Sequence, residues 1–291
     1  LEPGLNALFG MEYDRYSDEW SDVFETESSD RAFEEEVMLS GFGQAPVKSE
    51  GAAVSFDTAN EAYTARYTHE TIALAFAITE EAVEDNLYDR LSTRYTRALA
   101  RSMSNTKEVK GANILNNAFD STYTFGDGKE LCATDHPTVG GGNFRNELST
   151  SADLNETSLE QSLIDIAAFI DERGLLVAVQ GRKLIIPPAL QFVADRLMAS
   201  TLRPGTADND INAVRNMGML ADGYAVNHYL TDTDAFFIKT DAPNGFKHFE
   251  RSPVKTSMEG DFDTGNVRYK ARERYSFGVS DPRCVFGSPG A

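Results

Sequence analysis

The feature that most constrains this chain is an uninterrupted run of helix-forming residues from Thr79 to Phe119. The run contains no proline, and Thr79 followed by Glu80 and Glu81 is typical of a helix N-terminus, where a hydroxyl caps the first turn and acidic side chains favour the helix dipole. At 1.5 Å per residue such a helix would be about 60 Å long, far beyond the three or four turns of an average helix. We therefore predict one long helix, with Gly111 as the point where it kinks or ends.

Two stripes follow the helical period along this segment. An apolar stripe predicts the face that packs against the rest of the protein, and it consists of Val83, Leu87, Leu91, Tyr95 and Ala98. An adjacent basic stripe consists of Arg90, Arg94, Arg97 and Arg101. One helix thus combines a packing face with a cationic edge.

The segment before the helix divides into two parts. Residues 1–45 are acidic and lack a regular hydrophobic pattern, and a stretch of this composition rarely folds alone. Large apolar side chains recur within it, and exposed aromatic residues at this density need a surface to lie on. The sequence therefore predicts an N-terminal arm that docks on its own chain or on a neighbour.

Residues 52–68 alternate between polar and apolar side chains, which predicts a long β-hairpin with a polar break at residues 57–61. A lone two-stranded ribbon is marginal in water, so this hairpin needs a partner surface. The residues expected to contact another subunit are Val54, Phe56, Tyr63 and Tyr67.

Residues 120–156 are rich in Gly, Ser, Thr and Asn and predict a long surface loop. An α/β subdomain is expected at about 150–240. It would begin with a helix capped by Thr157 and Glu160, buried through Leu159, Leu163, Ile166 and Ile170, and ended by Gly174. Further strands are expected at 175–179, 184–186, 224–229 and 235–239, with a helix from Pro187 to about Ser200.

The C-terminal region returns to β-structure. Strands are expected at 246–249 and 267–277, and the second strand alternates strictly. Its apolar face is interrupted by Glu273, which needs a partner if it is buried. Its other face carries a second basic stripe, made of Arg268, Lys270, Arg272 and Arg274.

The two basic stripes allow two interpretations. The chain has 46 acidic against 27 basic residues and a net charge of −19, so ion pairs within or between subunits could occupy these cations. Alternatively, the stripes could contact phosphates without reading sequence, since no aromatic residues interleave with them as in single-strand binders. A chain this acidic repels nucleic acid over most of its surface, so any such contact is local.

Composition excludes several protein classes. With 291 residues, 41% of them hydrophobic, the chain can bury a core of one large or two associated domains. Two cysteines, Cys132 and Cys284, are too few for a disulfide framework and are expected to be free thiols. No apolar run could span a bilayer, and the first twenty residues lack the order of a signal peptide, so we expect a soluble, unexported protein.

The catalytic and cofactor motifs are weak. The four histidines are scattered, and Cys132 with His136 has the spacing of only half a zinc site. Gly140–Gly142 lacks the Lys-Ser/Thr of a phosphate loop, and the acidic clusters at 208–210, 232–234 and 261–263 do not match a calcium-binding loop. The sequence therefore predicts no catalytic residues, no metal and no cofactor.

The order of elements resembles the major capsid (major head) protein fold of tailed bacteriophages, first named for phage Hong Kong ninety-seven. Three long strings resemble the Mu-like head subunit group in particular: STLRPGTADNDINAVRNMGM at 200–219, NHYLTDTDAFFIKTDAPNGFKHFER at 227–251 and EGDFDTGNVRYKARERYSFGVSDPR at 259–283. The resemblance runs over nearly the whole chain. It implies an α+β fold with an N-terminal arm (1–46), an extended β-hairpin loop (47–78), a peripheral domain with a long spine helix (79–149), an α/β axial domain (150–240) and a peripheral β ribbon with the C-terminus (241–291).

The resemblance also implies a function. The chain would self-assemble as hexamers and pentamers into the icosahedral head that encloses double-stranded DNA, in the virion, after assembly in the bacterial host cytoplasm. Its partners would be copies of itself, the portal, scaffolding or decoration proteins and, by non-specific contact, the packaged DNA, with no membrane. Lys48 lies at the base of the loop, but no lysine and asparagine pair aligns with the covalent cross-link of the family's founding member.

Three alternatives remain at this stage. A bacterial nanocompartment shell of the same fold differs only in its cargo. An acidic metal-dependent hydrolase would use the aspartate clusters with Cys132 and His136. A monomeric binding protein would not assemble at all.

Overall fold

The computed structural model describes residues 2–84, 88–203, 210–261 and 265–291. The chain divides into two compact units, each assembled from separate stretches of sequence. The first unit contains residues 1–34, 67–111 and 248–277, and the second contains residues 35–66, 112–247 and 278–291.

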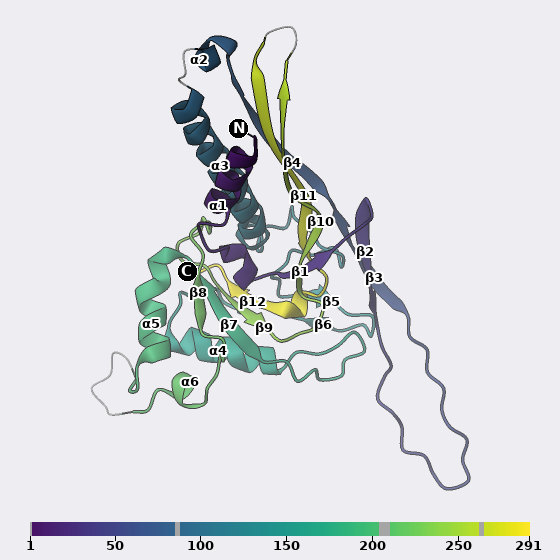
Figure 1. The fold of residues 1–291 in the computed structure, drawn as a ribbon. Coiled ribbons are helices and arrows are strands. Elements are labelled where there is room, and N and C mark those ends of the chain that lie inside the picture. The colour runs from purple at the N-terminus through teal and green to yellow at the C-terminus, as the bar shows by residue number, and fades with distance from the viewer. Residues whose placement is uncertain (1, 85–87, 204–209, 262–264) are drawn as a thin grey trace. The chain divides into compact units, whose positions relative to one another are not determined.

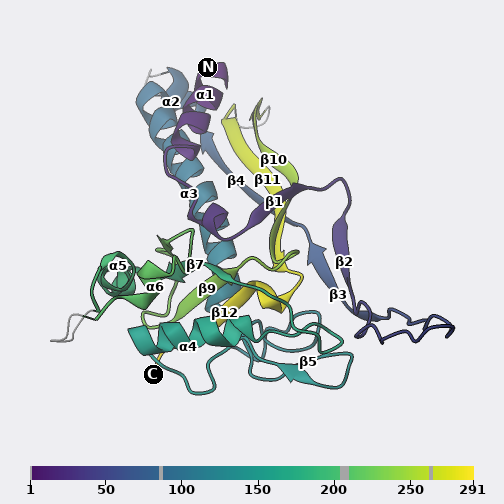
Figure 2. The ribbon, with the colours of Figure 1, turned by 90° about the horizontal axis from the view of Figure 1, so that it is seen from below.

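The first unit is a two-layer arrangement of helices on a sheet. Its four-stranded sheet has the order β1-β10-β11-β4, with bounds Glu25–Ser28 (β1), Phe246–Gly260 (β10), Val267–Val279 (β11) and Glu70–Ile78 (β4). Helices α1 (Glu2–Tyr13) and α3 (Tyr88–Asn116) lie on one face of this sheet (Figures 1 and 2). A short helix α2 (Glu80–Glu84) and a 3₁₀ turn η1 (Glu19–Asp22) complete the unit.

The core of this unit lies between the helices and the sheet. Leu5 and Phe9 of α1, Leu99 and Met103 of α3, and Tyr269 of β11 are buried against one another. The strict alternation predicted for the C-terminal strand is confirmed, because Tyr269, Ala271, Glu273 and Tyr275 point into the core while Arg268, Lys270 and Arg272 are exposed. β11 pairs antiparallel with β4, from Val267 opposite Ile78 to Tyr275 opposite Glu70.

The long helix is present, but its packing face differs from the prediction. Thr79 accepts a hydrogen bond from the Ala82 backbone N–H, as expected of a cap, and α3 then runs to Asn116. Tyr95 is 44% exposed and Ala98 is exposed, whereas Ser92 and Thr96 are fully buried. The predicted face was therefore wrong, because small polar residues fit the closely packed side of the helix. Val83 and Leu87 fall outside the side chains that the structure describes.

The second unit contains a mixed sheet covered by helices. The sheet has the order β12-β9-β7-β8, with bounds Val285–Ser288 (β12), Phe236–Thr240 (β9), Gly181–Ile186 (β7) and Tyr224–Val226 (β8). β7 is parallel to β8 and antiparallel to β9. The helices are α4 (Glu156–Ala167), α5 (Gln191–Ala199) and α6 (Ala213–Asn216), preceded or joined by η2 (Pro188–Leu190) and, near the C-terminus, η3 (Pro282–Cys284). Leu159, Ile166, Leu184, Phe236 and Phe286 lie at the centre of its core.

Several details of this unit correct the sequence analysis. The cap of α4 is Asn155, whose side chain accepts from the Ser158 backbone N–H while the Ser158 hydroxyl accepts from Asn155 N–H, so the expected Thr157 and Glu160 box was wrong. α4 ends at Ala167, and Gly174 instead occupies a turn with φ +83°. Residues 175–179 form only an isolated bridge at Leu176. The predicted helix after Pro187 and the strand near 235–239 are confirmed.

The predicted hairpin at 52–68 was also wrong. Its second half is the strand β3 (Glu61–Thr68), but the partner of β3 is β2 (Phe33–Leu39), and Val54 and Phe56 belong to no strand. Residues 40–60 connect the two strands as a long irregular loop (Figure 1). The alternation at 52–56 did not form a strand, because among the described residues no strand pairs with this segment. A second two-stranded ribbon joins β5 (His136–Pro137) to β6 (Asn143–Phe144) within the predicted surface loop.

Candidate assembly surfaces

The N-terminal segment docks on its own chain. Leu5 and Phe9 are buried against α3 and the sheet, and Trp20, Val23 and Phe24 are also buried. Trp20 packs against His248 with ring centroids 4.4 Å apart. The sequence allowed this arm to dock on its own chain or on a neighbour. The buried side chains named here dock on their own chain.

Two buried carboxyl groups hold this segment. The carboxylate of Glu108 on α3 accepts hydrogen bonds from the backbone N–H groups of Glu19 (2.9 Å) and Trp20 (3.0 Å), and burial raises the pKa of Glu108 to about 7 despite these bonds. Glu273 of β11 accepts a hydrogen bond from the Tyr13 hydroxyl at 3.0 Å, and burial raises the pKa of Glu273 as well. Tyr13 is thus the partner that the sequence required for Glu273.

The loop of residues 40–60 displays apolar side chains to solvent. Val47 is 99% exposed, Phe56 is 97% exposed, and Val54 is largely exposed. Asp57 holds part of the loop in place, because it accepts a hydrogen bond from the Gly43 backbone N–H at 2.8 Å and forms an ion pair with Arg173. We call the exposed set Val47, Val54 and Phe56 the loop patch. Large apolar side chains that a surface loop leaves this exposed are typical of a contact with another molecule.

The two tyrosines predicted beside this loop have contacts within their own chain. The Tyr63 hydroxyl donates to the Ser280 carbonyl oxygen at 3.1 Å, and its ring lies so close to Gly126 that an added Cβ would be 2.5 Å from it. Tyr67 is buried and packs edge-on against Phe249, with centroids 4.8 Å apart. Both tyrosines thus have contacts within their own chain, and their expected contact with a neighbour stays a prediction.

The basic stripe of β11 is largely exposed. Arg268, Lys270 and Arg272 are exposed, whereas Arg274 is half-buried and lies near His69, whose pKa is lowered by burial and by that guanidinium. Arg268 forms an ion pair with Asp261. In the part of the chain that the structure describes, Lys270 and Arg272 form no ion pair.

The basic stripe of α3 is exposed too. Arg94, Arg97 and Arg101 all reach solvent and form no ion pair with any described residue, while the side chain of Arg90 lies outside the described residues. Arg97 and Arg101 line a shallow depression together with Glu12 of α1. This stripe therefore borders a carboxylate of α1.

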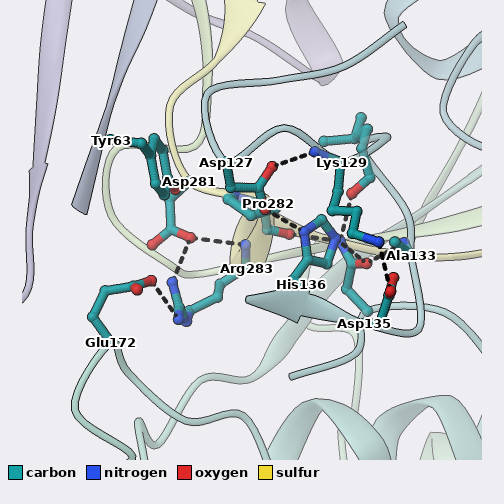
Figure 3. Close-up of polar contacts among 12 residues, drawn as sticks. Tyr63, Asp127, Lys129, Ala133, Asp135, His136, Glu172, Asp281, Pro282 and Arg283 are labelled. Carbon is teal, nitrogen blue, oxygen red and sulfur yellow. Dashed lines mark hydrogen bonds and ion pairs between the residues drawn. The ribbon is translucent and has the colours of Figure 1, made fainter. Parts of the chain in front are cut away.

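The second unit contains a buried polar cluster that was not predicted from the sequence (Figure 3). His136 is fully buried between Asp127 Oδ2, 2.6 Å from Nδ1, and Asn146 Oδ1, 3.0 Å from Nε2. Because the Asn146 amide donates to the Leu131 and Pro282 carbonyl oxygens, its Oδ1 must accept, so His136 donates at Nε2. His136 thus binds side chains of its own chain rather than completing a site with Cys132.

Arg283 organises the other half of this cluster. It is 3% exposed, and its guanidinium contacts Glu172 at 2.9 Å and Asp281 at 3.2 Å, donates to the Ile170 carbonyl at 2.7 Å, and lies 4.2 Å from the Phe144 ring centroid (Figure 3). Removing one member of such a buried pair leaves an uncompensated charge, which destabilises proteins strongly. The side chains of His136, Glu172 and Arg283 are buried, so their contacts join separate loops of the unit.

The sequence held little signal for this cluster. The cluster joins three separate stretches of sequence, namely 127–146, residue 172 and 281–283, and no catalytic or metal-binding motif spans them. Among the described residues, no group of three or more His, Cys, Asp or Glu side chains is arranged to hold a metal ion. Cys132 and Cys284 are buried free thiols, and burial raises the pKa of both. Within the described ranges, no helix has the length and apolar character needed to cross a bilayer.

Comparison with known proteins decides the family. A family model described as "Phage capsid protein" matches residues 62–287, which is most of the chain. The chain belongs to the phage capsid protein family. As a capsid protein it is a structural component of a phage head, and the recognition made from the three sequence strings is confirmed at this level. No curated protein matches the chain.

Solved structures show the same fold in other capsid proteins. The capsid of an empty GTA particle matches with a TM-score of 0.60 and 13% identity over 95% of this chain and 91% of that chain. The Mycobacterium phage Che8 structure matches with a TM-score of 0.53 and 15% identity over 94% and 92%, respectively. A virus-like particle from Pyrococcus furiosus matches with a TM-score of 0.53 and 11% identity over 98% and 97%. At these identities the likeness establishes the fold, which is the predicted α+β fold of tailed-phage capsids.

The family match also bears on the alternatives. A nanocompartment shell would share the fold, but the family model that matches this capsid protein is a phage one, so that alternative is not favoured. The hydrolase and the monomeric binding protein are likewise not favoured by the family. The limits predicted for arm, loop, peripheral and axial domains, and the finer Mu-like grouping, stay predictions.

Proposed function

We propose that this capsid protein is the major subunit of an icosahedral phage head, assembled as hexamers and pentamers around double-stranded DNA. The observation that carries the proposal is the loop patch, which exposes apolar side chains on a long loop of a chain in the capsid family. A subunit gains from burying such side chains only when another molecule covers them. Copies of the same chain are the partner that a shell provides.

The wider setting follows from the same proposal. The subunit would reside in the virion and assemble in the bacterial host cytoplasm, with portal and scaffolding or decoration proteins as further partners. Contact with packaged DNA would be non-specific and local, because the net charge of −19 repels phosphate over most of the surface. The protein would be structural, without catalytic residues, metal or cofactor.

The test replaces the loop patch while keeping the fold. Val47→Ser, Val54→Ser and Phe56→Ser together should leave the unfolding free energy within about 0.5 kcal/mol of wild type, as is usual for exposed positions. Shell formation, followed by electron microscopy and sedimentation, should fall sharply because the contact loses its apolar area. A matched control is Leu176→Ser with Met217→Ser, which also removes exposed apolar side chains of the second unit.

The result separates the proposal from its rivals. Closed shells from the wild type and none from the triple variant are expected, with the control assembling more than the triple variant. Normal shells from the triple variant would show that the loop patch is not an interface. A wild-type chain that stays monomeric at high concentration would contradict the proposed function itself.

A further inference from the structure

The two basic stripes face opposite sides of the first unit. Arg97 and Arg101 lie on the exposed side of α3, and Lys270 and Arg272 lie on the face of β11 that points away from the core. Helices and core separate these two surfaces (Figure 2). One partner surface therefore cannot cover both stripes, and in the wall of a shell at most one of them can face the contents.

The stripe on the sheet is part of a larger surface. On β10, Val254 and Met258 pack against the core, so Lys255 between them points to the same side as Lys270 and Arg272. We call the exposed side chains of Lys255, Arg268, Lys270 and Arg272 the cationic sheet face; by the same alternation one carboxylate, that of Glu259 on β10, lies on this side near its end. Successive cations on β11 are about 7 Å apart along the strand. Only Arg268 among these four has an ion pair within the described residues.

A column of small side chains borders these cations. In the register of β11 with β4, Arg268, Lys270 and Arg272 lie opposite Ala77, Ala75 and Ala73, and all three alanines are exposed. The result is a flat shelf beside a row of cations, without bulky side chains of β4 to block it. A partner that lies here meets positive charge and apolar surface together.

Given the proposed function, on which this inference rests, we propose that the cationic sheet face binds carboxylates of a second copy of this chain. Charge complementarity supports a second copy, because each copy carries 46 acidic against 27 basic residues and so has a surplus of carboxylates to offer these cations. The alanine shelf supports a polypeptide, which gains by covering apolar surface. A DNA backbone gains from cations and hydrogen-bond donors but not from alanines.

Zero-length carbodiimide cross-linking tests this contact directly. Unlabelled and ¹⁵N-labelled chains are mixed before assembly, and cross-linked peptides are identified by mass spectrometry. Lys270 should join an Asp or Glu in peptide pairs that combine light and heavy chains, which proves a contact between copies. Lys110 with Glu70, an ion pair of the same chain, provides the positive control for the chemistry and should appear without mixed labels.

Charge reversal supplies the second readout. Lys270→Glu with Arg272→Glu places like charges in the contact, and assembly should fall by about tenfold or more, which corresponds to about 1.4 kcal/mol. The matched control, Arg97→Glu with Arg101→Glu, makes the same change of net charge on the opposite side of the unit. Melting curves establish that both variants fold. If both double variants reduce assembly equally, the change in net charge explains the loss. The cross-links alone then decide whether the cationic sheet face contacts a second copy.

The outcomes distinguish this inference from the proposed function. Closed wild-type shells in which Lys270 forms no cross-link between copies would overturn the inference and leave the function intact. Normal assembly of Lys270→Glu with Arg272→Glu but reduced DNA per particle would overturn it in favour of a DNA-facing surface. A wild type that associates without closing shells would refute the proposed function, while the mixed-label cross-link would still report on the contact.

Discussion

At the scale of single residues, the acidic character of this chain extends into its interior. Glu108 and Glu273 are buried in the first unit, and each accepts hydrogen bonds from the N-terminal segment. Burial penalises the charged form of a carboxyl group, which is why both pKa values are raised. The docking of the N-terminal segment on the first unit is therefore sensitive to pH.

Glu108 gives the sharpest pH prediction. A carboxyl group whose pKa is about 7 when folded and about 4.5 when unfolded binds its proton more tightly in the folded chain. The contribution of this tighter proton binding to the free energy of unfolding is complete below about pH 4.5, and it is lost as the pH rises through about 7. Glu108→Gln retains an oxygen that accepts a backbone hydrogen bond, and it should remove up to about 3 kcal/mol of this pH dependence.

The measurement is urea unfolding of wild type and Glu108→Gln between pH 5 and 8. Other buried groups titrate in both proteins, so the difference between the two curves isolates Glu108. That difference should favour the variant increasingly as the pH rises. A difference that stays constant with pH would show that Glu108 titrates at the same pH in both states.

At the scale of elements, the N-terminal helix is a structural member of the first unit. Phe9 of α1 is 2% exposed and packs in the core with Leu99 and Met103 of α3. The amphipathic pattern of α1 is weak. Its burial therefore depends on packing against α3 and the sheet more than on a pattern that the sequence of α1 displays.

Phe9→Ala should lower the free energy of unfolding by about 3–5 kcal/mol, the usual cost of removing a buried aromatic side chain. Chemical denaturation measures this loss. Met11→Ala provides the control, because Met11 lies on the same helix but is 75% exposed and should cost less than about 0.5 kcal/mol. Equal stability of both variants would mean that α1 is not docked in solution.

Sequence patterns predicted best those elements whose buried face follows the same spacing as their hydrophobic residues. β11 alternates strictly because one face meets the core, and the prediction for residues 267–277 was confirmed. The face of α3 was mispredicted because hydrophobicity alone does not rank Ser92 and Thr96 above Tyr95. The pairing of β3 with β2 was missed since strand partners depend on the whole fold. The cluster of His136 and Arg283 joins distant loops, which no local pattern encodes.

At the scale of the whole molecule, the loop of residues 40–60 differs most from the rest. Among its described residues, few backbone N–H groups have partners, and the loop patch is largely open to solvent. A free subunit has nothing with which to protect this backbone. The proposed shell does, through its neighbouring copies.

Hydrogen exchange should therefore distinguish the two states of this loop. Amides between residues 44 and 56 should exchange at close to unprotected rates in the free subunit, and at least about tenfold more slowly in assembled particles, because local opening then requires breaking an interface. Amides of β9 are the control, since this central strand is protected in both states. Equal exchange of the loop in subunit and particle would argue against its burial by a neighbour.

The division of the first unit among three stretches of sequence has a consequence for the timing of synthesis. β1 pairs with β10, which is made about 220 residues later, so the sheet cannot close until the ribosome has translated nearly the whole chain. At bacterial rates of 5–20 residues per second, this delay is roughly 10–40 s. Throughout that interval the basic strand β11 does not yet exist. A nascent chain therefore cannot offer the cationic sheet face to finished subunits, and only completed chains can join a growing wall.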